Sequence, residues 1–591
     1  MLLAVLACGL AMFVWQLGST GLVDETPPLF AASARAMAET GDWLTPRVNG
    51  LPRYDKPPLV YWLMGLGYLL PAQELWNPLG TWAARLPSAF STVVVMLLLA
   101  ATLLRFPQPL PSGSLPGPRQ QALTALGAAL AFGLSPLVLL WSRIAVSDAL
   151  FSGCLAVTLL LFWRCYARSA AEAWWQGWLV LGLAVLAKGP VAVVLSGLTL
   201  ALFALLGGDG RTLWQRLRPW PGLLITAAVA LPWYLVMLVV EGQPFWDSFF
   251  GYHNLQRFTA VVNHHLQPWW FFLPVLVVAS LPVSPLLLQG LVEALRRPRQ
   301  APAPAATLQL YAACWLLAVL LFFTVAATKL PSYWIPATPA AGLVIALAAQ
   351  DPRRLWGRVT SLVLTAVLAV GLAVSPLWIP LINDPELPTL PAELLLSGLV
   401  LRAAGCMGLS LLLGLLLWSP RWRQGWLVGL QLPMVLYVLL AHLPMVVLGD
   451  RVRQLPVRGI AAAVNRMARP QEPLAMVGIL KPSLHYYTRR VVLFEGIEPV
   501  GPINLSDRLA REVRRGFQPS PATPEATLLL VIDQGTAQLP QWRELPHQSL
   551  ASDGLYRLWR VPRLALEQRA AALQRAGVEG PTWQLPRPER Y

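Results

Sequence analysis

Blocks of apolar residues long enough to cross a lipid bilayer recur along most of this chain. A helix needs about 20 predominantly apolar residues to span the roughly 30 Å hydrocarbon core of a bilayer. The blocks dominate a sequence of 591 residues that is 56% hydrophobic and only 13% charged, whereas a typical soluble domain carries about 25% charged residues. The pattern excludes a soluble globular enzyme and a disordered chain, and it predicts a polytopic α-helical membrane protein.

We expect about thirteen transmembrane helices. Their predicted ranges are 2–18, 82–104, 122–141, 148–166, 174–187, 190–206, 220–240, 269–291, 308–327, 333–350, 358–381, 396–418 and 426–448. A further apolar stretch, 59–70, lies within the long connection 19–81. Because it is too short to cross a bilayer, we expect a re-entrant or interfacial helix there.

The charges of the loops predict the orientation of the helices. Lys and Arg concentrate in cytoplasmic loops, and a cytoplasmic N-terminus places Arg105, Arg119, Arg421 and Arg423 in such loops. The loop 382–395, on the opposite side, contains acidic residues and no Lys or Arg. The net charge of +16 is therefore attributed to membrane orientation, and no nucleic-acid partner is expected. An odd number of spans leaves the C-terminal tail outside the cytoplasm.

The tail differs from the rest of the chain. Short apolar runs separated by polar, helix-like stretches are typical of a small α/β domain, and the runs are Leu474–Ile479, Val491–Phe494 and Leu528–Ile532. We therefore predict two domains. Residues 1–449 form a transmembrane catalytic domain that includes the periplasmic loop 19–81 with its interfacial helices, and residues 450–591 form a soluble periplasmic α/β domain.

Charged and polar residues next to the spans gather at the outer face in this predicted topology. Charges at membrane level are energetically costly and point to function. The residues concerned are Asp24, Glu25, Asp55, Lys56, Asp148, Lys188, His253, Arg257, Lys329 and Tyr333.

These residue types suit a phosphorylated lipid. Lys56, Arg257, Lys329 and Tyr333 can jointly hold a phosphate, because Lys and Arg form charge-assisted hydrogen bonds to its oxygens. The carboxylates of Asp24, Asp55 and Asp148 can act as a base, orient a hydroxyl or hold a divalent cation. On residue chemistry alone, the chain is a membrane enzyme or a transporter of a phosphorylated lipid.

A series of motifs favours the enzyme over the transporter. In order they are Asp24-Glu25-Thr26, Gly41-Asp42-Trp43, Lys56-Pro57-Pro58-Leu59, Ala84-Arg85-Leu86-Pro87, Ser142-Arg143 with Asp148, Ala187-Lys188-Gly189-Pro190, His253-Asn254-Leu255-Gln256-Arg257-Phe258, Pro268-Trp269-Trp270-Phe271 and Lys329-Leu330-Pro331-Ser332-Tyr333. Over roughly residues 1–350 this series resembles the bacterial aminoarabinose transferases (ArnT-like) and their relatives among protein O-mannosyltransferases.

The resemblance implies a GT-C fold, an active site that faces the periplasm and a polyprenyl-phosphate sugar donor. It also implies site residues. Asp24 matches the family's essential carboxylate, with Glu25 beside it, and Asp148 matches a further carboxylate of the cavity. Lys56, Arg257 and Tyr333 match contacts to the donor phosphate, and Lys329 is an additional candidate. Asp55 stands where the family usually has Glu, at a position that the family links with His253 to a bound zinc.

Each of these residues also has a purely structural alternative. Lys56 and Lys329 can instead pair with Asp55 or with backbone carbonyls, and Lys188 can satisfy carbonyls at a helix break. His253 can be an ordinary loop histidine, because two ligands do not make a zinc site.

We interpret the chain as an inner-membrane glycosyltransferase. It is expected to transfer a monosaccharide from a polyprenyl phosphate to lipid A, another lipid, a glycan or a protein at the periplasmic face. The alternative is a flippase or transporter of lipid-linked sugars, which predicts pseudo-symmetric halves and charges along a transmembrane path.

Overall fold

The computed structural model describes residues 1–110, 113–168, 173–207, 209–260, 266–296, 303–351, 355–384, 386–419, 421–514 and 526–583. The chain divides into two compact units. The first consists of Met1–Ser19, Tyr54–Ile382 and Pro391–Val446, and the second of Thr20–Arg53, Asn383–Leu390 and Val447–Tyr591. This grouping differs from the predicted division at residue 450 in two segments, because residues 20–53 and residues 383–390 pack with the tail.

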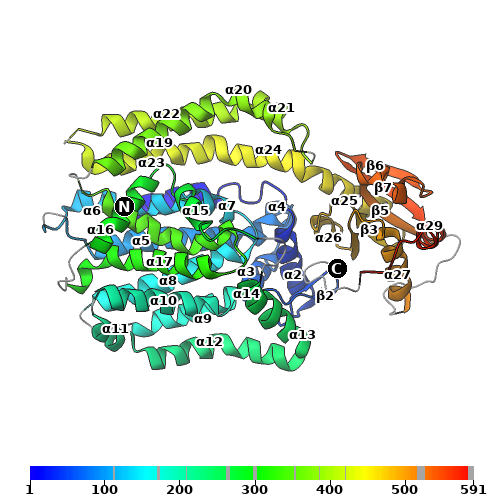
Figure 1. The fold of residues 1–591 in the computed structure, drawn as a ribbon, viewed down its shortest axis with the longest axis horizontal. Coiled ribbons are helices and arrows are strands. Elements are labelled where there is room, and N and C mark those ends of the chain that lie inside the picture. The colour runs from blue at the N-terminus through cyan, green and yellow to red at the C-terminus, as the bar shows by residue number, and fades with distance from the viewer. Residues whose placement is uncertain are drawn as a thin grey trace. The chain divides into compact units, whose positions relative to one another are not determined.

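The first unit is helical, and most of its helices run roughly parallel or antiparallel to one another (Figure 1). Its principal helices are α1 (Leu2–Gly9), α3 (Leu59–Tyr68), α4 (Gln73–Trp76), α5 (Thr81–Arg105), α6 (Pro118–Gly133), α7 (Pro136–Trp141), α8 (Ser147–Ala167), α9 (Trp174–Lys188), α10 (Val191–Gly207), α11 (Gly210–Leu217), α12 (Pro219–Val240), α13 (Gln243–Phe245), α14 (Arg257–Thr259), α15 (Phe272–Val278), α16 (Ser284–Arg296), α17 (Leu308–Val325), α18 (Thr338–Ala348), α19 (Trp356–Ala373), α20 (Ser375–Trp378), α21 (Leu390–Ser397), α22 (Leu399–Leu416) and α23 (Trp426–Tyr437). The next helix, α24 (Leu443–Arg453), begins in the first unit and ends in the second.

Shorter π- and 3₁₀-helical segments link these helices. The π-helical ones are η1 (Leu10–Val14), η2 (Trp246–Gln256) and η7 (Val438–His442), and the 3₁₀ ones are η3 (Pro304–Ala306), η4 (Pro331–Ala337), η5 (Ile379–Leu381) and η6 (Arg423–Gly425).

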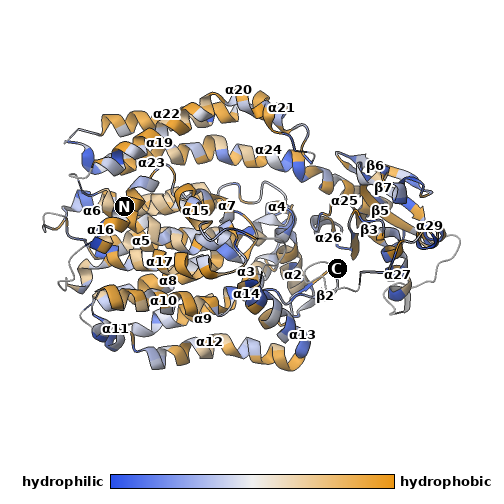
Figure 2. Cartoon of the chain, viewed as in Figure 1, coloured by the Kyte–Doolittle hydropathy of each residue, from blue (hydrophilic) through white to orange (hydrophobic). Residues whose placement is uncertain are grey.

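Seven helical stretches among the described residues are long and apolar enough to cross a membrane. They are Thr81–Arg105, Ser147–Ala167, Pro219–Val240, Leu308–Val325, Trp356–Ala373, Leu399–Leu416 and Arg423–Arg453. Hydrophobic residues cover these stretches over most of their length (Figure 2). Hydrophilic residues gather in short helices beside them, such as α11 and α13, which come before and after α12. The chain is therefore a multi-pass membrane protein, as predicted, while the count of thirteen spans stays a prediction.

Breaks in the helices explain why several predicted spans are divided. The stretch 122–141 contains α6 and α7, which are separated by Leu134 and Ser135 before Pro136. Proline cannot donate a helical hydrogen bond, so it favours the start of a new helix. The predicted interfacial segment 59–70 contains α3, which at 1.5 Å per residue is about 15 Å long and shorter than a bilayer core.

The second unit contains a five-stranded mixed sheet. Its strands are β3 (Leu474–Val477), β4 (Val492–Glu495), β5 (Thr527–Asp533), β6 (Gln548–Asp553) and β7 (Tyr556–Pro562), in the order β4-β3-β5-β7-β6. The pairs β3–β4 and β3–β5 are parallel, whereas β5–β7 and β6–β7 are antiparallel. A separate two-stranded ribbon joins β1 (Arg47–Val48) to β2 (Leu51–Pro52).

Helices cover both faces of the five-stranded sheet. They are α25 (Leu455–Met467), α26 (Ser483–Thr488), α27 (Gly501–Arg514), α28 (Pro540–Arg543) and α29 (Arg563–Arg575), with the 3₁₀ turn η8 (Thr536–Gln538). The remaining helix of this unit, α2 (Thr26–Thr40), packs against α26 and β1. Side chains alternate along a strand, so Leu474 and Met476 belong to one hydrophobic cluster and Ala475 and Val477 to the other. The predicted small α/β fold of the tail is confirmed.

Candidate functional site

An ion pair joins two helices of the first unit. Lys188 is the last residue of α9 and Asp148 is the second residue of α8. The Lys188 ammonium donates a hydrogen bond of 2.7 Å to an Asp148 carboxylate oxygen, and both side chains are less than one-fifth exposed. The negative charge of Asp148 at the start of α8 and the positive charge of Lys188 at the end of α9 each interact favourably with the dipole of their helix.

Gly189 ends α9 directly after Lys188. Its φ of +100° lies in the region that side-chain-bearing residues rarely adopt. A Cβ there would also lie 3.3 Å from the Phe249 ring and 3.5 Å from the Asn254 amide oxygen. This sharp helix end therefore depends on glycine, and it fixes where the Lys188 side chain begins.

Three more predicted or neighbouring residues join this pair. The Lys188 ammonium lies 5.4 Å from the centre of the Tyr333 ring, within the range of a cation–π contact. The Ser332 hydroxyl and the charge of Lys56 both act on the Asp148 carboxylate. We call Lys56, Asp148, Lys188, Ser332 and Tyr333 the lysine–aspartate cluster.

Lys56 is also tied to its neighbour in sequence. Its ammonium donates to the Asp55 carbonyl at 2.9 Å and lies 3.6 Å from an Asp55 carboxylate oxygen. Tyr61 donates its hydroxyl to the other carboxylate oxygen of Asp55 at 3.1 Å. The structural alternative for Lys56, pairing with Asp55, is thus present, and it coexists with the effect of Lys56 on Asp148.

Arg257 and Lys329 lie on segments that are bonded through their backbones. The Thr328 and Ala327 amides donate to the carbonyls of Arg257 and Phe258. Lys329 is buried and donates to the Ala326 carbonyl at 2.8 Å, which is the structural alternative expected for it. Tyr333 follows four residues later and stacks on Phe323.

The proposed metal ligands were tested against what zinc requires. Zinc sites use three or four protein ligands, and in the ranges that the structure describes no group of three His, Cys, Asp or Glu side chains could hold a metal. Asp55 is engaged by Tyr61 and Lys56, and His253 is buried in η2. Among the described residues Asp55 and His253 therefore have no third ligand beside them, so the zinc site stays a prediction and no mechanistic step below uses a metal.

Asp24 belongs to the second unit, where it caps α26. The Ser483 amide donates to one carboxylate oxygen at 2.9 Å and the Ser483 hydroxyl donates to the other at 2.6 Å. Burial raises the pKa of Asp24 to about 6, against the opposing effect of these hydrogen bonds and of the charges of Lys481 and Arg453. Asp24 is therefore mostly ionised at pH 7 but close enough to neutrality to exchange a proton. Glu25, the next residue, is exposed at the start of α2.

Sequence reasoning missed the residues that surround Asp24. Lys481 is 5% exposed and pairs with Glu386 at 2.9 Å, and Arg453 approaches the same carboxylate at 3.5 Å. One signal was available: only four of the 45 basic residues of the chain are lysines, namely Lys56, Lys188, Lys329 and Lys481. None of the four is exposed, and each has a defined partner.

Two family models match parts of the chain. Residues 116–235 match the dolichyl-phosphate-mannose-protein mannosyltransferase model. Residues 467–577, most of the second unit's sheet and helices, match the C-terminal domain of cyanobacterial RgtA-type glycosyltransferases. Both matched families are glycosyltransferases, and one match lies within each unit.

A solved structure has the same fold. The crystal structure of ArnT from Cupriavidus metallidurans bound to undecaprenyl phosphate matches with a TM-score of 0.74 at 24% identity, over 98% of this chain and 99% of that one. The ArnT-like GT-C fold predicted from the motifs is confirmed.

Curated relatives share more of the sequence. The undecaprenyl phosphate-alpha-4-amino-4-deoxy-L-arabinose arabinosyl transferase of Pseudomonas aeruginosa strain UCBPP-PA14 is 31% identical over 417 residues, which are 69% of this chain and 70% of the relative. A similarly named transferase of Sodalis glossinidius is 30% identical over 62% of this chain and 63% of the relative. The chain belongs to the family of undecaprenyl phosphate-alpha-4-amino-4-deoxy-L-arabinose arabinosyl transferases.

Proposed function

We propose that this chain transfers an amino-deoxy pentose from undecaprenyl phosphate to a lipid acceptor. The sugar and carrier are those in the names of its relatives. The observation that carries the proposal is the lysine–aspartate cluster, in which the ammonium groups of Lys56 and Lys188 act on Asp148 and Tyr333 lies beside Lys188. Ammonium groups form charge-assisted hydrogen bonds with phosphate oxygens, which a neutral sugar does not offer.

The cluster supports departure of a phosphate. An acceptor oxygen attacks the anomeric carbon while the bond from that carbon to the phosphate oxygen breaks, and the bonding electrons leave with undecaprenyl phosphate. The leaving phosphate gains negative charge in the transition state, where preorganised cations are most effective. We assign Lys56, Tyr333 and Arg257 to this role, with Lys329 as an additional cation. Asp148 holds Lys188 in position beside Tyr333.

Asp24 is assigned to the acceptor. A general base works best when its pKa lies near the working pH, and burial raises the pKa of Asp24 to about 6. A hydroxyl acceptor would give its proton to Asp24, whereas a phosphate acceptor such as that of lipid A is already anionic and needs only orientation. Glu25 is a second carboxylate for the same task.

We further propose that the reaction takes place on the periplasmic side of the inner membrane. The loop charges support this orientation, because arginines lie in the loops assigned to the cytoplasm and the loop 382–395 lacks basic residues. The second unit then also lies in the periplasm.

The test is a turnover assay with purified protein in lipid nanodiscs. The donor is undecaprenyl phosphate-linked 4-amino-4-deoxy-L-arabinose, the acceptors are lipid A and a lipid without phosphate, and released undecaprenyl phosphate is measured. Lys56→Gln and Asp24→Asn are each expected to reduce turnover at least about 100-fold, in the range typical for lost electrostatic or acid–base catalysis. Glu544→Gln, a change at a 69% exposed acid, is the control and keeps full turnover.

The outcomes separate enzyme from transporter. Movement of the donor across the bilayer without release of undecaprenyl phosphate would favour a flippase and refute the proposal. Turnover that is unchanged in Lys56→Gln would refute the role of the cluster, even if the protein is a transferase.

A further inference from the structure

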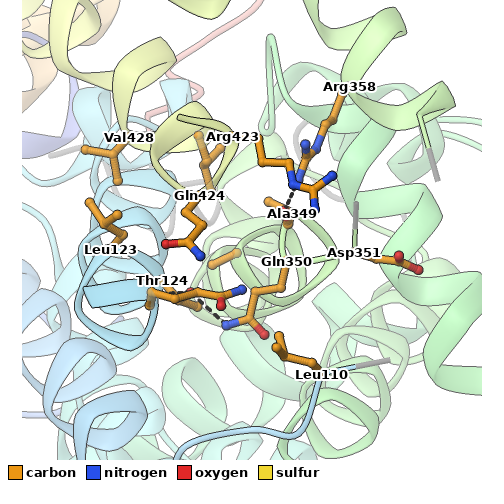
Figure 3. Close-up of a pocket in the computed structure, with 13 residues that line it drawn as sticks. Leu110, Leu123, Thr124, Ala349, Gln350, Asp351, Arg358, Arg423, Gln424 and Val428 are labelled. Carbon is orange, nitrogen blue, oxygen red and sulfur yellow. Dashed lines mark hydrogen bonds between the residues drawn. The ribbon is translucent and has the colours of Figure 1, made fainter. Parts of the chain in front are cut away.

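A polar pocket lies in the first unit, and none of its lining residues belongs to the lysine–aspartate cluster. It has a volume of about 190 Å³, whereas one water molecule needs only about 15 Å³ by this measure. Figure 3 shows its lining residues, which come from the start of α6, the end of α18, the start of α19 and the segment η6–α23. The pocket therefore sits where several helices of the bundle begin or end.

Two arginines enter this pocket from different elements. Arg358, on the first turn of α19, is 5% exposed, and Arg423, in η6, is exposed. Their side chains reach the same part of the pocket (Figure 3), and the charge of Arg423 acts on Arg358. The two guanidinium groups repel each other, and an anion bound between them would relieve this repulsion through charge-assisted hydrogen bonds.

Arg358 has unused hydrogen-bonding capacity. One terminal nitrogen donates to the Ala349 carbonyl at 2.6 Å, and the guanidinium lies 5.6 Å from the Trp426 ring. Its Nε is buried and, among the residues that the structure describes, has no hydrogen-bond partner. A buried donor without a partner is costly, and a ligand oxygen in the pocket would satisfy it.

The charges around the pocket remain positive overall. Asp351 is buried in the lining and acts on Arg358 with the opposite charge. Outside the lining, Arg119 and Arg421 both lie near the Trp422 ring, at 6.0 and 5.3 Å. The lining thus holds two arginines and one carboxylate, and Arg119 and Arg421 add positive charge beside Trp422, the residue before Arg423.

The surroundings are those of a membrane–water interface. Trp356, Trp418 and Trp422 are between 36% and 48% exposed, and exposed tryptophans mark the level of lipid head groups. From Trp356, the exposed side chains Val359, Val363 and Val367 run along α19 at helical spacing. This exposed apolar face of α19 lies on a different side of the helix from the buried Arg358 and indicates that α19 borders the lipid.

We propose that the pocket between α6, α18, α19 and α23 binds the phosphate of an anionic membrane phospholipid through Arg358 and Arg423. The lipid would be a structural ligand, and this site is independent of sugar transfer. Arginine forks bind two phosphate oxygens at once, and basic pockets between transmembrane helices are known to suit such head groups.

Native mass spectrometry of the purified full chain tests this proposal. Phosphatidylglycerol is titrated against wild type, Arg423→Gln and Arg358→Gln, with Arg105→Gln as the control. Arg105 is an exposed arginine at the end of α5 that precedes α6, and it does not line the pocket. We expect about fivefold weaker binding in Arg423→Gln, from the roughly 1 kcal/mol that one arginine contributes near an anionic surface, and no change in Arg105→Gln.

Other lipids and a soluble phosphate complete the design. Equal retention of phosphatidylcholine, or equal binding by Arg423→Gln and wild type, would overturn the proposal. Displacement of phosphatidylglycerol by an equal concentration of glycerol 3-phosphate would show a site for a soluble phosphate and would overturn the lipid assignment. Because Arg423 is exposed, its variant decides the outcome even if Arg358→Gln fails to fold.

Discussion

The Lys188 ammonium and the Asp148 carboxylate are 2.7 Å apart, so the end of α9 is fastened to the start of α8. Both residues were visible in the sequence as charges beside apolar spans, but their pairing was not. The pair is the centre of the lysine–aspartate cluster, and its energetics can be measured.

A double-mutant cycle measures the coupling between these residues. Lys188→Met leaves the Asp148 charge without its nearest partner, whereas the double variant with Asp148→Asn removes both charges. We expect a coupling free energy of about 1–3 kcal/mol in thermal unfolding of the detergent-solubilised protein. The pair Arg569 and Glu544, in which Glu544 is 69% exposed, serves as the comparison and should give less than about 1 kcal/mol. Additive effects at Lys188 and Asp148 would contradict the prediction.

Gly189→Ala should disturb the cluster without removing any charge. The φ of +100° and the nearby Phe249 ring disfavour a side chain, and the expected loss of stability is about 1–3 kcal/mol. We also expect lower sugar transfer, because Lys188 would be displaced. Gly197→Ala is the matched control: it lies within α10, no atom lies within 4 Å of an added Cβ, and alanine favours a helix by up to about 1 kcal/mol. Equal effects of the two substitutions would contradict this explanation.

The raised pKa of Asp24 predicts that stability falls as pH rises from about 4 to 6. Burial raises the folded-state pKa to about 6 from an ordinary value of 3.8. In this window the folded state therefore binds more protons than the unfolded state, and stability decreases with increasing pH. The total decrease should be about 3 kcal/mol. Hydrogen exchange of β3 and β5 measures it, and Asp24→Asn should abolish the decrease.

Activity should change in the opposite direction over the same window. If ionised Asp24 accepts a proton or orients the acceptor, turnover should rise with pH through about 6. A turnover profile that is flat between pH 5 and 7, with a hydroxyl acceptor, would argue against Asp24 as a base.

Ser483→Ala should shift that profile upward. The Ser483 hydroxyl donates to Asp24 at 2.6 Å and lowers its pKa, so its loss should move the activity midpoint up by about one pH unit. Ser483→Thr keeps the hydroxyl and should restore the midpoint. Ser549→Ala, at an exposed position of β6, is the control. A purely structural cap would lower stability without moving the midpoint.

Features that depend on a local residue pattern could be predicted from the sequence. Hydropathy located the long helices, and the apolar runs of the tail became β3, β4 and β5. Pro136 shows why span boundaries were harder, because a helix break can leave the hydropathy of a stretch unchanged. The motifs identified the family, since several separated groups of residues occurred in one order.

Partners far apart in the chain could not be predicted in the same way. Asp24 and Ser483 are 459 positions apart, and no periodicity relates the first long connection to the tail. The grouping of residues 20–53 with the tail was missed for the same reason. Lys188 was recognised as a residue at a helix break, but whether it would bond to carbonyls or to a carboxylate depended on how α8 and α9 pack.

The scarcity of lysine has a practical consequence. Because the chain's basic surface consists of arginine and all four lysines are less than one-fifth exposed in their side chains or buried, an amine-directed reagent would find few targets besides the N-terminus. Slow labelling of Lys56 or Lys188 would then report on the state of a single small region. The rate at which these few lysines are labelled therefore measures local structure, and a phosphate bound at Lys56 or Lys188 is expected to slow the labelling of that amine.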